Sequence, residues 1–391
     1  MSARARPLRV LIACDHIDYD GALHGGGRQL IELTRALDRD EVEPTVCILR
    51  KASALGRELQ DEGLPFEFFG HARFSPASLP RLVRIIRERE IDVLHLTDFG
   101  AATFGRLAGL ITHTPAILQV ISHHSEHQAR GFPKYVEAAY RALAPATART
   151  LAISETVKDF AVAHMGAVRD GVEVLPYPLP EHSFSAPEPD EVASVRRLHG
   201  IGADEPVIGS VTRFFPSKGI RYLIEAFARV HPHFPSARLV LVGQGPEEGS
   251  LRSLAQRLGV TDRVIFAGFQ RRPQRYVAMF DVAAVPSVEE GFGLVALEAQ
   301  ALGIPVVASR AGGLPDIIAH GRSGLLVEVG DVPELTAALQ RLLGDAALRE
   351  RMGQAAVGNA ARFSLDRYAG RLTQIYRELG NGRAAHPRVG S

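Results

Sequence analysis

The sequence predicts an α/β protein made of two doubly wound domains, each a parallel sheet covered by helices. Short apolar or β-branched runs alternate with amphipathic segments, which is the pattern of βαβ units. The alternation occurs in two series, separated by a proline-rich stretch from Glu173 to Asp190 that cannot form one continuous helix or central strand. We therefore expect an interdomain linker there, with ligands bound in a cleft between the domains, beyond the carboxyl ends of the strands.

The first series begins with an apolar run, Leu8–Cys14, that predicts a strand. A loop is expected at Gly25–Gly27 and a helix at Gln29–Leu37, because Leu30, Leu33 and Leu37 recur at helical spacing. The other expected elements of this series are strands at 45–49, 66–69, 93–96, 116–120 and 150–153 and a helix at 80–89. This series places the first domain at residues 1–182.

The second series begins with a strand at Val207–Val211. Its other expected elements are strands at 238–242, 264–267, 282–285 and 306–309 and helices at 221–230 and 249–258. A last helix, Leu365–Leu379, follows when the series is complete. We therefore expect a second domain at residues 183–364 and a C-terminal segment, 365–391, that crosses back to the first domain.

Composition limits the classes of function. A chain of 391 residues, 46% hydrophobic and 23% charged, is typical of a globular enzyme, and a net charge of +1 gives no reason to expect a nucleic-acid partner. The cysteines, Cys14 and Cys47, both lie in apolar runs, which favours buried thiols in a reducing compartment. The first apolar run is too short for a signal peptide, and no run approaches the roughly 18 apolar residues of a membrane span. We expect a cytoplasmic protein.

The strongest functional motif runs from Pro286 to Glu298, where a strand end leads through a glycine-bearing loop into a helix. A helix that begins near Gly293 would direct free N–H groups and its positive dipole end at a diphosphate. Glu298 would lie about 7–8 Å further along the axis, which suits a ribose, and we expect it to be buried because its helix is apolar nearly all round. Glu290 would lie on the other side, where it could accept hydrogen bonds from a donor sugar. The alternative is a pair of ordinary surface glutamates.

A second motif, Arg213 to Gly219, follows a predicted strand and contains Arg213 and Lys218. Lysine is scarce in this chain, so a lysine at a motif position is informative. Two cations there would stabilise a leaving diphosphate in the transition state without a metal. The alternative is an exposed turn with ordinary surface charges.

Two weaker motifs follow strands of the first domain. His24-Gly-Gly-Gly-Arg28 predicts either a loop that approaches a phosphate or sugar closely, or an ordinary tight turn. His123, His124 and His127 lack the spacing of a helical zinc-binding pair, so hydrogen bonding to a substrate hydroxyl is favoured over a metal site, with a structural histidine as the alternative.

The helix expected near Arg81–Arg89 has one apolar face and several arginines. Such a helix more often packs on a core with its charged side in solvent than it binds a membrane. A weak peripheral contact with the inner face of a membrane, and a lipid-linked acceptor there, rest on this helix alone.

Together these motifs resemble those of retaining GT-B glycosyltransferases of family 4, also called glycosyl transferases group 1. The likeness is dense over residues 206–365 and thinner over 8–180. It is carried by Arg213-x4-Lys218-Gly219, Leu241-Val-Gly-Gln-Gly-Pro246, Val264-Ile-Phe-Ala-Gly268, Glu290-x7-Glu298, Gly303-Ile-Pro-Val-Val-Ala308 and Ala311-Gly-Gly313. The sequence departs from the family at Leu175-Pro-Tyr-Pro-Leu-Pro180 and in an extended loop, Asp15–His24, both on the acceptor side.

The resemblance implies a GT-B fold, two Rossmann-like domains facing each other across a cleft, in a bacterial enzyme of carbohydrate biosynthesis. It implies that the N-terminal domain, 1–182, binds the acceptor and that the C-terminal domain, 183–364, binds the nucleotide-sugar. It implies that Arg213 and Lys218 bind the donor diphosphate, that Glu298 holds the ribose, and that Glu290 contacts the donor sugar. The full donor site it implies is Gly26, Gly27, Arg213, Lys218, Gly243, Phe266, Glu290, Gly291, Phe292, Gly293, Leu294 and Glu298. The catalytic residues it implies are Glu290, His123, Arg213 and Lys218, with His124 as the alternative to His123.

The function this implies is retaining transfer of a sugar from a nucleotide-sugar, UDP-sugar preferred and GDP-sugar possible, to a hydroxyl of a saccharide, glycolipid or small-molecule acceptor. In such enzymes the leaving phosphate takes the acceptor proton, and a double displacement through Glu290 is less favoured. No metal or other cofactor is expected. The alternatives are a sugar-nucleotide epimerase or phosphorylase of the same fold, or a non-catalytic nucleotide-sugar-binding protein.

Overall fold

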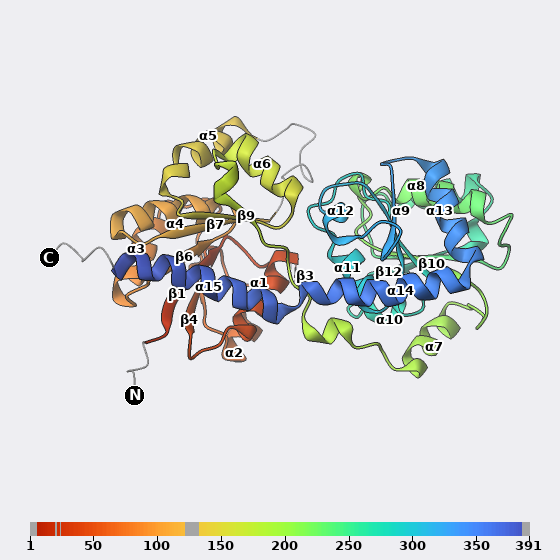
Figure 1. Cartoon of the computed structure of the whole chain (residues 1–391), viewed down its shortest axis with the longest axis horizontal. Helices are drawn as coiled ribbons and strands as arrows, with labels where there is room; N and C mark the ends of the chain where they lie inside the picture. The colour runs from red at the N-terminus through yellow and green to blue at the C-terminus, as the bar shows by residue number, and fades with distance from the viewer. Residues whose placement is uncertain (1–5, 20–21, 24, 122–132, 385–391) are drawn as a thin grey trace. The chain divides into compact units, whose positions relative to one another are not determined.

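A computed structural model describes residues 6–19, 22–23, 25–121 and 133–384 of the chain. The chain forms two compact units, one comprising Met1–Pro178 and Leu365–Ser391 and the other comprising Leu179–Ser364 (Figure 1). The last helix therefore belongs to the same unit as the first strand. Each unit has a parallel sheet flanked by helices, so the predicted doubly wound α/β class is confirmed for both.

The first unit is built on a seven-stranded parallel sheet of order β5-β4-β1-β6-β7-β8-β9. The strand order reverses between β1 and β6, so the switch point at which doubly wound sheets bind ligands lies at the carboxyl ends of these two strands. A short antiparallel hairpin, β2–β3, follows β1. The strands are β1 (Leu8–Cys14), β2 (Asp18–Tyr19), β3 (Ala22–Leu23), β4 (Val42–Ile48), β5 (Phe66–Phe68), β6 (Val93–Leu96), β7 (Ala116–Val120), β8 (Arg149–Ala152) and β9 (Val172–Val174).

Helices cover both faces of this sheet. The apolar side of α3, with Leu82, Ile85 and Ile86 buried, packs together with α4 and the sheet into one core. Arg84 and Arg87 of α3 are exposed, whereas Arg81 is half-buried. A packed helix with a solvated side was the interpretation favoured by the sequence. The helices are α1 (Gly25–Ala36), α2 (Ala54–Asp61), α3 (Ser78–Glu88), α4 (Phe99–Thr112), α5 (Lys134–Ala142), α6 (Glu155–Met165) and α15 (Leu365–Ala384).

The loop predicted at Gly25–Gly27 is wrong, because these glycines form the first turn of α1. Gly27 lies against the backbone of the β1–β2 connection, where an added β-carbon would be only 1.9 Å from the carbonyl oxygen of Ile17. Glycine is therefore needed for close packing, and the tertiary contact outweighs the low helix propensity of three glycines.

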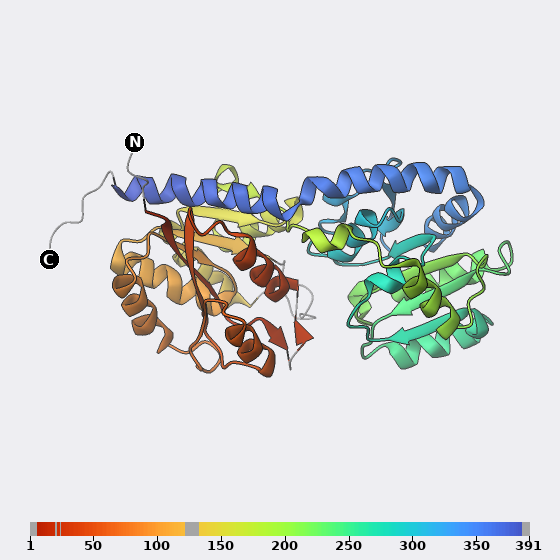
Figure 2. The ribbon, with the colours of Figure 1, turned by 90° about the horizontal axis from the view of Figure 1, so that it is seen from below.

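Helix α15 is joined to the first sheet by a buried chain of hydrogen bonds. Gln119 donates through Nε2 to the Tyr368 hydroxyl at 2.8 Å, so its Oε1 accepts from His95 Nε2 at 2.6 Å. The other His95 nitrogen, Nδ1, then accepts from the Tyr376 hydroxyl at 2.6 Å. Burial lowers the pKa of His95 to about 4, so the ring is neutral and makes both bonds at physiological pH. Figure 2 shows α15 lying along the first unit although it is last in the chain.

The second unit has a six-stranded parallel sheet of order β12-β11-β10-β13-β14-β15, which is the Rossmann order 3-2-1-4-5-6. Its switch point lies between β10 and β13. The strands are β10 (Val207–Val211), β11 (Arg238–Val242), β12 (Val264–Gly268), β13 (Val282–Val285), β14 (Val306–Ser309) and β15 (Gly324–Val327). The helices are α7 (Pro189–Leu198), α8 (Ile220–Val230), α9 (Glu248–Arg257), α10 (Gln274–Val277), α11 (Leu294–Ala301), α12 (Leu314–Ile317), α13 (Val332–Gly344) and α14 (Ala346–Ala360).

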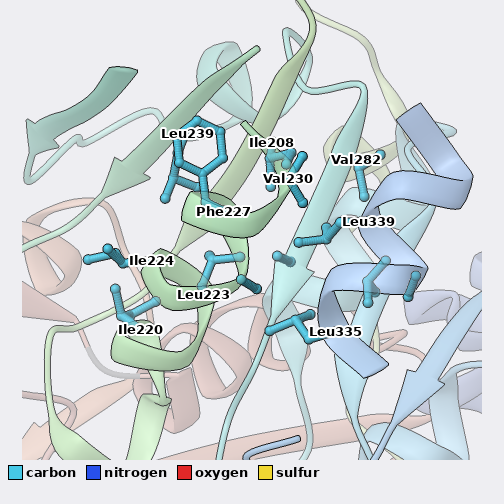
Figure 3. Close-up of a cluster of buried hydrophobic side chains, with 14 of the residues drawn as sticks. Ile208, Ile220, Leu223, Ile224, Phe227, Val230, Leu239, Val282, Leu335 and Leu339 are labelled. Carbon is cyan, nitrogen blue, oxygen red and sulfur yellow. The ribbon is translucent and has the colours of Figure 1, made fainter. Parts of the chain in front are cut away.

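The core of the second unit lies between α8, α13 and the sheet (Figure 3). Leu223 and Phe227 of α8 are fully buried, and each such side chain contributes about 1.5–3 kcal/mol. The proline-rich stretch includes the end of β9, a 3-10 turn at Glu181–Phe184 and the start of α7, so it is not one continuous element. No helix in the described ranges has both the length and the apolar composition that a bilayer span requires.

We predict that Tyr376→Phe destabilises the first unit by about 1–3 kcal/mol, because it leaves the buried Nδ1 of His95 without a donor. The melting temperature should fall by roughly 2–4 °C per kcal/mol. Tyr135→Phe, which removes the hydroxyl of a side chain that is 72% exposed, is the matched control and should leave the melting temperature unchanged. Equal melting temperatures for both variants would contradict the role given to the buried chain.

Candidate active site

The second unit brings two of the predicted motifs together at its switch point. The segment with Arg213 and Lys218 follows β10, and the segment with Glu290 follows the neighbouring strand β13. Lys218 Nζ lies 3.2 Å from Glu290 Oε2, and the two side chains are only 11% and 17% exposed. The pair is therefore largely shielded from water, which strengthens its electrostatic interaction compared with a surface ion pair.

Backbone contacts with the β10 loop fix one side of the loop that contains Glu290. The carbonyl of Ser217 accepts hydrogen bonds from the N–H groups of Val288 and Glu289, at 2.8 and 3.1 Å. The buried hydroxyl of Ser287 donates to Glu290 Oε2 at 3.2 Å. Sequence reasoning missed Ser217 and Ser287, because a backbone carbonyl and a single serine leave no recognisable pattern.

The loop after β14 fixes the other side of the Glu290 loop. The N–H of Gly313 donates to the Glu290 carbonyl at 3.2 Å. Gly312 adopts a left-handed φ of +50°, and an added β-carbon there would lie 1.4 Å from the same carbonyl oxygen. Only glycine allows this approach. The Ala311-Gly-Gly313 segment therefore sets the position of the Glu290 backbone.

Helix α11 begins where the sequence predicted. Gly293, at a φ of +103°, precedes its first residue Leu294, so the helix N-terminus lies next to the Glu290 loop. Phe292 is buried and its ring contacts Phe363, so it can offer a ligand only its backbone. The expectation that Glu298 is buried was wrong: its side chain is partly exposed, while its neighbours Leu297 and Ala299 are buried. Gln300, the other polar residue of the helix, is fully buried and donates to the Ile317 carbonyl, so only Glu298 lies at the boundary of the core.

The other residues of the predicted donor site lie around the same sheet edge. Arg213 is exposed, with its guanidinium carbon 5.1 Å from the centre of the Phe215 ring. Gly243 has a φ of +136°, and an added β-carbon would lie 1.8 Å from the Thr212 carbonyl oxygen, so it holds the β10 and β11 loops together. The ring of Phe266 makes an edge contact with Phe214 and has Arg252 over its face at 4.2 Å.

The first unit has its own polar cluster at the switch point. Asp15 follows β1 and Asp98 follows β6, and Asp98 Oδ2 accepts a hydrogen bond from the Asp15 N–H at 3.0 Å. The Asp15 carboxylate accepts from the N–H groups of Gly100 and Ala101, at 3.0 and 2.7 Å. Burial and the nearby Asp15 carboxylate raise the pKa of Asp98 to about 7, and burial raises the pKa of Asp15. Sequence reasoning missed both, although an acid directly after a strand is a detectable signal.

The predicted residues Gly26 and Gly27 line a narrow pocket of the first unit, together with Asp98, Gln119 and Tyr368. The pocket thus adjoins both the acidic pair and the hydrogen-bond chain that holds α15. The predicted His123 and the alternative His124 lie outside the described residues. Among the described residues, no group of three or more His, Cys, Asp or Glu side chains is arranged to hold a metal ion.

Comparison with known families gives a match for each half of the chain. Residues 23–180 match the model of Glycosyltransferase Family 4, and residues 193–358 match the model of Glycosyl transferases group 1. The D-inositol 3-phosphate glycosyltransferase of Corynebacterium efficiens is 43% identical over 192 residues, which cover 47% of this chain and 45% of that protein. The chain thus aligns with less than half the length of that relative.

A second relative aligns over more of its length. The GDP-mannose-dependent alpha-(1-6)-phosphatidylinositol monomannoside mannosyltransferase of Mycolicibacterium smegmatis is 32% identical over 292 residues, which cover 72% of this chain and 74% of that protein. Among solved structures, the Anabaena protein HepE in complex with UDP and glucose has a TM-score of 0.79 at 22% identity, over 95% of this chain and 100% of that one. Sucrose-phosphate synthase of Thermosynechococcus elongatus has a TM-score of 0.74 at 21% identity, over 96% and 100%. These similarities show that the chain has the GT-B fold.

We predict that Gly312→Ala destabilises the second unit by more than about 2 kcal/mol, because a methyl group would overlap the Glu290 carbonyl and the backbone must shift. Gly321→Ala is the matched control, since Gly321 has a φ of +77° and no atom within 4 Å of an added β-carbon. Its cost should be only the roughly 1–2 kcal/mol of a left-handed alanine. Thermal unfolding of both variants measures the difference, and equal losses would contradict the close contact.

Proposed function

The chain belongs to the group 1 glycosyltransferases of family 4, and from this premise we propose that it transfers a sugar from a nucleotide-sugar to a hydroxyl of an acceptor. The proposed donor is a UDP-sugar, with a GDP-sugar as the alternative, and the acceptor is a saccharide, glycolipid or small molecule. HepE was solved with UDP, which supports the first donor, and the Mycolicibacterium relative is named as GDP-mannose-dependent, which supports the second.

The observation that carries the proposal is the Lys218–Glu290 pair at the switch point of the second unit, beside the N-terminus of α11. A cation, a helix N-terminus and a carboxylate within one loop cluster suit the three parts of a nucleotide-sugar. We propose that Arg213 and Lys218 bind the diphosphate, with the N–H groups of α11 beside them. Glu298, one turn further along and partly exposed, would accept hydrogen bonds from the ribose hydroxyls.

In the proposed reaction the bond between the anomeric carbon and the diphosphate oxygen breaks while the acceptor oxygen bonds to the same carbon from the same face. The acceptor proton passes to the leaving phosphate oxygen, so configuration is retained and charge balances. Negative charge grows on the diphosphate as the bond breaks. Arg213 and Lys218 would therefore stabilise the transition state more than the ground state.

The surroundings of Glu290 favour this route over a double displacement. Its Oε2 atom already accepts from Lys218 and Ser287, each at 3.2 Å, and both contacts lower the nucleophilicity of the carboxylate. We propose that Glu290 hydrogen-bonds the donor sugar and that its pairing holds Lys218 in place for the diphosphate. The two side-chain cations supply the positive charge, so we propose that no metal is required.

The other enzyme classes on this fold are less well supported. An epimerase or a phosphorylase would give donor turnover without an acceptor, or dependence on inorganic phosphate. A non-catalytic protein would bind a nucleotide without turnover. The matches to two glycosyltransferase family models support the transferase over these alternatives.

Calorimetric titration of the whole protein with UDP, GDP and ADP in EDTA tests the donor site. We expect micromolar binding of one nucleotide, UDP first. Glu298→Ala should weaken that binding by about 10- to 100-fold, because hydrogen bonds between a charged carboxylate and the ribose are lost. Glu290→Gln should leave nucleotide affinity within a few-fold and lower kcat with a nucleotide-sugar by about 100-fold or more.

Glu350→Ala, which removes an exposed glutamate of α14 in the same unit, is the matched control and should change neither quantity. No binding of any of the three nucleotides, either in EDTA or in a parallel titration with Mg²⁺, would remove the donor site. Full turnover by both Glu290→Gln and Glu298→Ala would show that the site residues are misassigned, and binding that EDTA abolishes would refute metal independence.

We also propose that the protein acts in the cytoplasm and touches the inner face of the membrane through a groove between α3 and α4. Leu79, Val83 and Ile111 line the groove together with Arg84, Arg87 and Glu88. Glu88 lies 3.9 Å from Arg84, and with two arginines to one glutamate the charged part of the lining is net positive. Ile111 is 49% exposed and its neighbour Leu110 is 54% exposed. Exposed apolar side chains next to arginines suit an anionic lipid surface, where each arginine contributes about 1 kcal/mol.

Sedimentation with vesicles tests this contact. We expect the protein to bind vesicles that contain anionic lipid and to release them at high salt. Arg84→Glu combined with Arg87→Glu should lower the bound fraction at least about tenfold. Arg221→Glu combined with Arg229→Glu, on the exposed side of α8 in the other unit, is the matched control. No binding to either neutral or anionic vesicles would remove the proposal.

A further inference from the structure

A cluster of aromatic side chains lies at the carboxyl edge of the first sheet and has no role in the function proposed so far. Phe74 lies in the segment after β5, Phe99 begins α4 after a two-residue connection from β6, and Tyr135 lies in the first turn of α5, which follows β7. Three separate chain segments thus bring a ring to the edge where doubly wound sheets bind ligands. We refer to these three residues as the aromatic platform.

Contacts among aromatic side chains hold the rings of the platform in place. Phe74 and Phe99 stack with their centres 4.8 Å apart and their planes within 10° of parallel, and Tyr135 meets Phe99 edge-on at 6.5 Å. Phe104 contacts Phe74 at 4.9 Å and Tyr140 contacts Phe99 at 5.6 Å. Even so, Phe74 is 44% and Tyr135 is 72% exposed. The platform is therefore ordered by its neighbours yet presents aromatic surface to solvent.

Backbone strain accompanies this exposure. Phe74 has a φ of +56° and Asp98, the residue before Phe99, has a φ of +58°. For a bulky side chain this left-handed conformation is a true outlier that costs about 1–3 kcal/mol, and such strain gathers at ligand sites. Core packing does not account for it at Phe74, because nearly half of that side chain remains exposed. Strain that keeps a ring at the surface points to recognition of a ligand.

Charged groups border the platform. Asp98 immediately precedes Phe99, and its carboxylate interacts with that of Asp15 at the switch point. Arg50 and Arg73, which follow β4 and β5, act electrostatically on Asp15. The edge therefore combines flat apolar faces with carboxylates that accept hydrogen bonds and with cations that donate them.

We propose that the aromatic platform and the Asp15–Asp98 pair bind the acceptor, and that the acceptor presents a pyranose ring to them. A pyranose has an apolar face of C–H groups that stacks on an aromatic ring and a rim of hydroxyls that donate to carboxylates. An alkyl chain would offer no hydroxyl to the carboxylates, which can accept more hydrogen bonds than the backbone N–H groups of Gly100, Ala101 and Asp15 supply, and a bare phosphate would leave the rings in water. The α3–α4 groove is a different surface, because none of its lining residues belongs to the platform and its α4 residue, Ile111, lies about 18 Å along the helix from Phe99.

This inference rests on the proposed function only in naming the bound sugar as the acceptor. The test is saturation-transfer NMR on the whole protein with UDP present, using methyl α-D-glucopyranoside, methyl α-D-mannopyranoside and maltose as probes. We expect at least one probe to receive saturation on the C–H protons of one ring face. Phe74→Gly and Tyr135→Ala should each lower the affinity of the protein for that probe at least about fivefold. Phe74→Gly removes the ring and also relieves the positive φ.

Leu198→Ala, which removes a 73% exposed apolar side chain in the other unit, is the matched control and should leave probe binding unchanged. Phe74→Tyr keeps a stacking face and should retain binding. The inference is overturned if no pyranoside receives saturation, or if Phe74→Gly and Tyr135→Ala bind like the wild type. It is also overturned if octyl β-D-glucopyranoside receives saturation only on its alkyl chain.

Titration with UDP in the same samples separates this inference from the proposed function. Bound UDP without any bound pyranoside would leave the donor site standing and remove the platform as a sugar site. Bound pyranoside that depends on Phe74, without binding of any nucleotide, would uphold the platform and remove the transferase.

Discussion

Backbone contact among three loops of the second unit is the constraint on which the rest of its candidate site depends. The loop with Glu290 is bonded on one side to the Ser217 carbonyl and on the other to the Gly313 N–H, and glycine at position 312 lets two backbones meet. Because these contacts involve main-chain atoms, the position of Glu290 does not rely on the rotamer of any long side chain. Lys218 is then paired with a carboxylate whose backbone is already fixed. A rigid scaffold of this kind suits a site that must bind a flexible diphosphate in one arrangement.

The two units use the same topology for different chemistry. In each, the strands on either side of the switch point supply the polar residues: Lys218 and Glu290 in the second unit, Asp15 and Asp98 in the first. The second site combines a cation and a helix N-terminus, which favour an anion. The first combines carboxylates with exposed rings, which favour a neutral polyol. The division follows from the side chains at the strand ends, since the backbone geometry of parallel strands is common to both.

The sequence was sufficient for the strands and for the main motifs, and insufficient for features set by tertiary contact. Runs such as Leu8–Cys14 and Val207–Val211 became strands with the predicted bounds, because buried parallel strands are continuously apolar. The glycines before Arg28 form a helical turn that packs against the Ile17 carbonyl, where there is no room for a side chain. No local sequence pattern reveals this contact. Glu298 is only partly buried because packing around one helix position depends on distant segments. Asp15 and Asp98 are 83 residues apart and meet only through the pairing of β1 with β6.

The place of α15 in the first unit has a consequence for how this protein is made. The unit begins with the first strand, yet the hydroxyls that bond to His95 and Gln119 come from a helix at the far end of the chain. While the ribosome is still translating the second unit, His95 and Gln119 have each other but lack the two tyrosine hydroxyls, and the sheet face that α15 covers is open to water. The second unit, which is one uninterrupted segment, has no such delay. Synthesis order and folding order are therefore reversed: the half that is made first is the half that is completed last, and its unfinished face must be kept from aggregating in the meantime.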